Sequence, residues 1–108
     1  MSVYYNRQGA PISVEQYSRL HGDEDYHRIG KQHFEGGIRV STVWLGIDHG
    51  FGSGTPILFE TMVFSGNDRY PYDQAQMRYC TEQEAIDGHR RTCDDIEHGR
   101  RPWFLGEE

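Results

Sequence analysis

The chain has 108 residues, which is enough for one domain and too short for two. Its net charge is −6, whereas proteins that bind nucleic acids cluster Lys and Arg to neutralise phosphates, so no nucleic-acid partner is expected. Hydrophobic residues make up only 35% of the chain, but aromatic residues make up 13%, which predicts a thin but ordered core.

The sequence gives no sign of a membrane protein. It lacks an apolar run of the roughly 18 residues that a membrane span needs, and residues 1–7 lack the apolar segment of a signal peptide. We therefore expect a cytoplasmic protein without a membrane partner. Cys80 and Cys93 are then expected to be reduced, although their positions in the sequence leave a disulfide between them open.

The first predicted helix begins after Ser13, because Ser13 and Gln16 form a capping box, and it ends at Gly22. Residues 23–26 follow as a turn or a single helical turn. Residues 27–35 alternate weakly and are predicted to form an edge strand, and the glycines in residues 35–37 indicate a hairpin.

Two stretches rich in β-branched and aromatic residues, 38–47 and 57–64, predict the central strands. A polar loop over 65–76 leads to a short strand at 77–80. Thr81 and Glu84 then form a second capping box, which predicts a helix that runs to about residue 98. Its apolar stripe has helical spacing and comprises Ala85, Ile86, His89, Cys93 and Ile96.

These elements predict an α+β fold, in which a three- to four-stranded antiparallel sheet carries a short N-terminal helix and a longer C-terminal helix packed on it. Residues 1–108 are expected to form a single domain, with Trp44 in its core. Gly88 lies inside the last helix, where glycine costs about 1 kcal/mol relative to alanine. A close approach of that helix to the sheet would explain the glycine.

The first candidate site is the glycine-rich loop that begins with Asp48 and His49. An Asp–His pair at the end of a strand can bind a ligand or transfer protons. The alternative is a structural loop, in which Asp48 accepts hydrogen bonds from backbone amides.

Two further candidate ligand-binding residues are Glu60, within a central strand, and His89, on the inner stripe of the last helix. A carboxylate among apolar neighbours has a raised pKa when it is buried. The alternatives are a Glu60 paired with a nearby Arg or His and a His89 that is hydrogen-bonded in the core. The six histidines include no pair with zinc-ligand spacing, so no metal site and no cofactor are expected.

Nucleophilic catalysis has little support, and we assign no catalytic residue. Neither cysteine has an obvious partner, and the sequence contains no Gly-x-Ser-x-Gly motif. Whether the protein is an enzyme stays open, with a non-enzymatic role favoured.

The apolar tail, residues 99–108, contains Trp103, Phe104 and Leu105. Large apolar side chains near a chain end indicate an interaction segment. The alternative is that the tail folds back over the protein's own sheet.

Residues 5–12, 40–49, 59–64 and 78–89 together resemble a family of small, uncharacterised proteins from actinobacteria and especially actinobacteriophages. Cys80 departs from the usual Ser-Thr pair of that family, and the tail is not one of its features. The resemblance implies a phage accessory protein in the cytoplasm of a host bacterium, with no assigned activity.

Two functions follow from these observations as hypotheses. The first is a protein that acts by protein–protein interaction, with a host protein or by self-association. The second is a small-molecule or metal-binding domain, perhaps a weak hydrolase, built on Asp48, His49, Glu60 and His89. The second requires at least three of these side chains to converge on one pocket.

Overall fold

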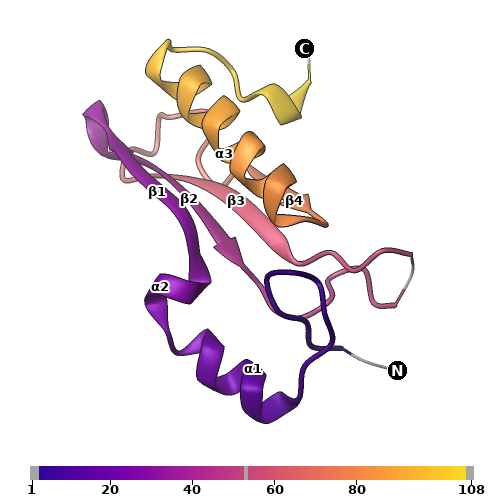
Figure 1. Ribbon diagram of the computed structural model, residues 1–108. Helices are drawn as coiled ribbons and strands as arrows, with labels where there is room; N and C mark the ends of the chain where they lie inside the picture. The colour runs from indigo at the N-terminus through magenta and orange to yellow at the C-terminus, as the bar shows by residue number, and fades with distance from the viewer. Residues whose placement is uncertain (1–2, 53, 107–108) are drawn as a thin grey trace.

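The computed structural model describes residues 3–52 and 54–106, which form an α+β fold (Figure 1). The elements in chain order are α1 (Val14–His21), α2 (Glu24–His27), β1 (Arg28–Phe34), β2 (Ile38–Trp44), β3 (Phe59–Ser65), β4 (Gln76–Tyr79) and α3 (Glu82–Glu97). Short 3₁₀ turns occupy Glu35–Gly37 and Trp103–Leu105. The predicted sheet with a short first helix and a longer last helix is confirmed.

The four strands form one antiparallel sheet in the order β1-β2-β3-β4, as the hairpin signals predicted. The central pair is in a register that places Thr42 opposite Thr61 and Trp44 opposite Phe59. Because side chains alternate between the faces of a sheet, these residues share one face. Helix α3 packs on that inner face, as Figure 1 shows.

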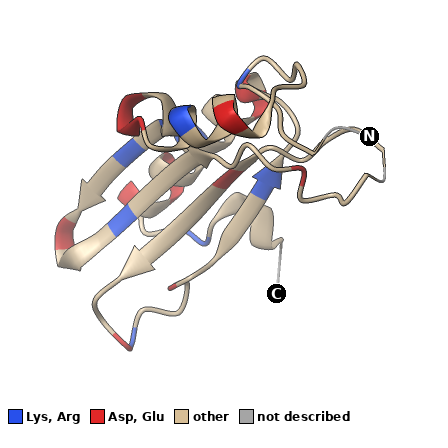
Figure 2. Ribbon diagram, turned by 90° about the horizontal axis from the view of Figure 1, so that it is seen from below, with Lys and Arg blue, Asp and Glu red and all other residues tan. Residues whose placement is uncertain are grey.

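The outer face of the sheet carries the alternate residues, among them Val43 opposite Glu60. Figure 2 views the sheet from the side opposite α3, and the strands there carry both basic and acidic positions. The short helices α1 and α2 lie beside one end of the sheet. No helix in residues 3–52 and 54–106 is long and apolar enough to cross a membrane.

Both predicted capping boxes are confirmed. Ser13 Oγ accepts a hydrogen bond from the Gln16 amide, and Thr81 Oγ1 accepts one from the Glu84 amide. The central strands are shorter than predicted, since β2 ends at Trp44 and β3 begins only at Phe59. Gly46 has a φ of +78°, which is incompatible with a continuing strand.

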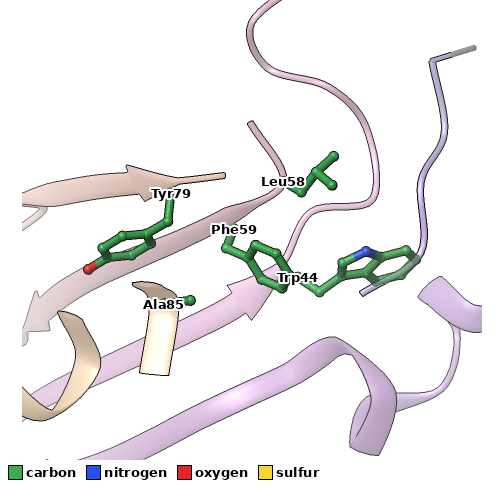
Figure 3. Packing of buried hydrophobic residues seen from close by; sticks show 5 residues of the cluster. All are labelled: Trp44, Leu58, Phe59, Tyr79 and Ala85. Atoms are coloured by element: carbon green, nitrogen blue, oxygen red, sulfur yellow. The ribbon is translucent and has the colours of Figure 1, made fainter. Parts of the chain in front are cut away.

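The core lies between the inner face of the sheet and α3, with an extension toward the N-terminal segment. One buried cluster consists of Trp44, Leu58, Phe59, Tyr79 and Ala85, which Figure 3 shows from close by. A second consists of Val40, Val63, Cys93 and Ile96. Trp44 has no exposed surface, so its predicted place in the core is confirmed.

Candidate functional site

The Asp48 side chain fixes the loop between β2 and β3. Asp48 Oδ1 accepts hydrogen bonds from the amides of Gly50, at 2.7 Å, and Ile57, at 2.9 Å, and Oδ2 accepts one from Gly52, at 2.9 Å. The Ile57 and Gly50 amides hold the pKa of the Asp48 carboxyl below its ordinary value. Asp48 therefore has the structural role that was the alternative to a ligand-binding one.

The same loop presents Phe51 to solvent. Phe51 is 92% exposed and has a φ of +53°, a left-handed conformation that non-glycine residues rarely adopt. It lies between two of the amides that Asp48 binds, those of Gly50 and Gly52. The sequence analysis missed this residue. The signal was a lone aromatic residue between two glycines, in a loop that begins with an aspartate.

Glu60 lies on the outer face of the sheet, opposite Val43 on β2. Its Oε2 accepts a hydrogen bond from Arg78 Nε on the neighbouring strand at 2.9 Å. Glu60 is thus paired with an arginine, which was the alternative to an unpaired acid with a raised pKa.

His89 lies on the inner face, in a hydrogen-bonded chain that joins α3 to the sheet. Thr42 Oγ1 is 2.7 Å from His89 Nδ1 and 2.6 Å from Thr61 Oγ1, and the Tyr79 hydroxyl donates to Thr61 Oγ1 at 3.0 Å. His89 Nε2 is 3.5 Å from Cys93 Sγ. With the proton on Nε2, each donor in this chain has one acceptor.

Burial favours the uncharged forms of the two α3 side chains in this hydrogen-bonded chain, His89 and Cys93. It lowers the pKa of His89 and raises that of Cys93 to about 11. A reactive cysteine needs a depressed pKa and some exposure, whereas Cys93 is buried. The hydrogen bond between His89 and Cys93 is therefore structural, since a thiol with a raised pKa and an imidazole with a lowered pKa are poorly suited to act as a nucleophile and its base.

Gly30 makes room for the His89 ring. A Cβ on Gly30 would lie 2.7 Å from His89 Nε2, closer than carbon atoms pack against nitrogen.

Both cysteines are free thiols, so the disulfide left open by the sequence is absent from the structure.

The buried imidazole predicts a loss of stability in mild acid. Because the pKa of His89 is lowered in the folded state, the unfolded chain binds a proton more readily, and stability falls as the pH drops below about 6.5. His27 acts in the same direction. We expect His89→Gln to flatten the change in unfolding free energy between about pH 7 and pH 5. A parallel pH profile for parent and variant in urea titrations would contradict this.

The four candidate ligand-binding residues do not form one cluster. His89 lies on the inner face and Glu60 on the outer face, and the Asp48 carboxylate binds its own loop. His49 lies next to Asp48 and uses its backbone amide to bond Ile57. Within the described ranges, the only group of three side chains of metal-ligating types close together is Asp94, Glu97 and His98, all exposed.

Residues 99–106, the described part of the tail, fold back onto the domain: they pack against α3, and Trp103 also contacts the core cluster that includes Tyr79 of β4. Residues 107 and 108 lie outside the described residues. The Trp103 indole N–H donates to Thr92 Oγ1 at 3.1 Å, and its backbone amide donates to Asp95 at 2.8 Å. The Arg91 guanidinium lies over the indole, 4.3 Å from the ring centroid. Trp103, Phe104 and Leu105 each remain partly exposed. Their role in binding a partner stays a prediction.

Trp103→Ala is expected to lower the free energy of unfolding by about 1–2 kcal/mol, because it removes a half-buried indole and a hydrogen bond to Thr92. Phe104→Ala, next to it, is the matched control and is expected to have a smaller effect. Chemical denaturation of the two variants measures the difference. Equal midpoints for Trp103→Ala and the parent would show that the docking contributes nothing.

Comparisons with models of known protein families, with curated proteins and with solved structures find no match to this chain.

Proposed function

We propose that this protein acts by binding another protein and not by catalysis. The observation that carries the proposal is Phe51, a large apolar side chain that is 92% exposed at the tip of a hydrogen-bonded loop. Aromatic side chains dominate the energetics of protein interfaces. A phenyl ring in this position is suited to enter an apolar pocket of a partner.

The loop supports this proposal because its backbone is held by Asp48. A side chain on a fixed backbone loses little conformational entropy on binding, which favours affinity. The left-handed conformation of Phe51 costs on the order of 1–2 kcal/mol relative to a helical one. A conformation of this kind persists only where the surrounding bonds enforce it. Here the hydrogen bonds that three backbone amides donate to the Asp48 carboxylate enforce it.

Two further exposed apolar residues lie on the segments next to this loop. Ile47 is 38% exposed and Val3 is 48% exposed. The Val3 carbonyl accepts a hydrogen bond from the Asp48 amide, which places this segment beside the loop. We name these three residues, Val3, Ile47 and Phe51, the Phe51 surface.

The second hypothesis, a ligand-binding domain or weak hydrolase, lacks the convergence of side chains that it needs. In the setting implied by the family resemblance, the partner is a protein of the actinobacterial cytoplasm or a second copy of the chain.

The proposal is tested by affinity capture from an actinobacterial lysate and by self-association of the purified protein, each with parent and Phe51→Ala. We expect Phe51→Ala to weaken either interaction by about tenfold or more. Val14→Ala is the matched control, since Val14 is also a well-exposed apolar residue but lies on α1. The proposal would be contradicted if Phe51→Ala captured partners and self-associated as well as the parent does.

A further inference from the structure

The outer face of the sheet is open over most of its area, because α3 packs on the inner face and α1 and α2 lie at one end (Figure 2). Strand pairing arranges the outer residues in three rows that run across the strands. The first row holds Arg39 and Phe64, the second Lys31 and Met62, and the third Glu60 and Arg78. We name these six residues the outer basic face, which combines basic with apolar side chains.

This face is basic although the chain as a whole is acidic. The four strands contain a single acidic residue, Glu60, whereas the whole chain has 17. Glu60 is neutralised by Arg78, since its Oε2 lies 2.9 Å from Arg78 Nε. Helix α3, on the other side of the sheet, has six acidic and two basic residues. The two sides of the sheet therefore carry opposite charge, which orients an acidic partner toward the outer basic face.

Lys31 and Arg39 supply the charge that no carboxylate on this face neutralises. Neither takes part in an ion pair within residues 3–52 and 54–106. The Arg39 guanidinium lies over the Phe64 ring, 4.5 Å from its centroid. Basic residues elsewhere are offset by nearby acids: Arg100 pairs with two carboxylates of α3, and Arg90 lies on that helix among its six acidic residues. Basic residues outside the sheet thus do not form a comparable surface.

A hollow of about 260 Å³ opens beside Lys31, between the sheet and α2. Its lining consists of Glu24, His27, Arg28, Lys31, Ser41 and Val43. Arg28 is already paired with Asp25, so Lys31 is the lysine or arginine of the lining that can pair with an incoming carboxylate. The Ser41 hydroxyl, opposite Lys31 in the sheet, can donate a hydrogen bond to the same group.

The spacing of the rows matches an extended chain. Successive rows are two residues apart along each strand, or about 7 Å, which is also the distance between side chains on one face of an extended segment. Arg39 and Lys31 lie in successive rows on neighbouring strands. A segment with a carboxylate at every second residue can therefore pair with both.

The face suits a protein better than a nucleic acid. Proteins that bind single strands present aromatic rings on which bases stack. Phe64, the aromatic residue of these rows, already lies under Arg39. Two unpaired cations are also few for a phosphate backbone, which the net charge of −6 repels.

We propose that the outer basic face binds an extended acidic segment of a partner protein, whose carboxylates pair with Arg39 and Lys31. Arginine binds carboxylates strongly because its guanidinium can donate two parallel hydrogen bonds. Met62 and Phe64 offer apolar contacts beside these pairs. The residues of the Phe51 surface lie outside the four strands, so this second surface goes beyond the proposed function and does not depend on it.

The experiment is fluorescence anisotropy on the full chain with a short labelled peptide in which Glu alternates with Thr, at about 20 mM and about 150 mM salt. The parent is expected to bind this peptide at low salt, to bind it more weakly at high salt, and not to bind a peptide in which Gln replaces Glu. Lys31→Glu with Arg39→Glu is expected to weaken binding by about tenfold or more.

The matched control is Arg19→Glu with Arg90→Glu, which changes the net charge equally at exposed positions of α1 and α3. It is expected to stay within about threefold of the parent. Thermal melts check that each variant folds. If the loss of Arg39 from the Phe64 ring prevents folding, Lys31→Glu alone, at an exposed position, is compared with Arg19→Glu alone and is expected to bind about threefold more weakly or worse.

Phe51→Ala is expected to bind the Glu peptide like the parent, so failure of the proposed function and failure of this inference are separate results. A parent that does not bind the Glu peptide at low salt would overturn the inference, and so would equal losses in the two double variants. Tighter binding of a single-stranded thymidine oligonucleotide of equal charge would overturn it in favour of a nucleic acid. Self-association that needs Lys31 and Arg39, without peptide binding, would overturn it in favour of the acidic α3 of a second copy.

Discussion

Replacing Trp44 with alanine is expected to lower the free energy of unfolding by about 3–5 kcal/mol, because it leaves a large cavity in a thin core. Trp44 has no exposed surface, and its ring centroid is 5.0 Å from that of Tyr26 and 5.9 Å from that of Tyr17. These contacts join the sheet to α1 and α2. The loss should therefore loosen the N-terminal segment as well as the core.

A hydrogen bond adds to this effect. The Trp44 indole N–H donates to the Tyr5 carbonyl at 3.0 Å, so the alanine variant also leaves that carbonyl without its donor. Phe51→Ala is a matched control, since it also removes an aromatic ring, but one that is 92% exposed. We expect that control to lie within about 0.5 kcal/mol of the parent. A melting temperature of Trp44→Ala within a few degrees of the parent would contradict the core role of Trp44.

The elements of the fold could be predicted because their signals are local. Ser13 with Gln16 and Thr81 with Glu84 are capping pairs three residues apart, and both begin helices as expected. The hairpin glycines between β1 and β2 indicated that these two strands are antiparallel neighbours, which the structure confirms. Alternation of side chains along β2 puts Trp44 and Thr42 on one face whichever strand pairs with it.

The candidate site could not be predicted, because its contacts depend on register and on distant segments. Glu60 meets Arg78 only because β3 and β4 pair in one particular register. His89 meets Thr42, which is 47 residues away in the chain. Spacing along the sequence carries no information on either contact.

In the loop between β2 and β3, the sequence indicated Asp48 and His49 as candidate site residues, because their side chains can bind ligands or transfer protons. The structure uses Asp48 for three backbone amides, and the exposed residue is Phe51. Glycines on both sides of an aromatic residue predict a loop, but they do not predict whether the aromatic side chain is exposed. Whether such a ring is buried or exposed depends on what the loop packs against.

Gly88→Ala is expected to lower the free energy of unfolding by about 2 kcal/mol, although alanine is the better helix former. The propensity term favours alanine by about 1 kcal/mol. A Cβ at this position would collide with the hydroxyl of Tyr79 and come within 2.5 Å of two of its ring carbons. Overpacking of a core costs about 1–3 kcal/mol, and a clash with three atoms belongs at the upper end.

Tyr79 cannot give way easily, because it is only 6% exposed and its hydroxyl donates to Thr61. The clash must therefore move α3 away from the sheet, which also strains the bond between Thr42 and His89. Gly22→Ala is the matched control: Gly22 caps α1, and its added Cβ would meet no atom closer than 3.7 Å. We expect Gly22→Ala to be neutral or to stabilise by up to about 1 kcal/mol. Urea titrations in which Gly88→Ala is as stable as Gly22→Ala would show that α3 does not approach β4 as closely as the structure places it.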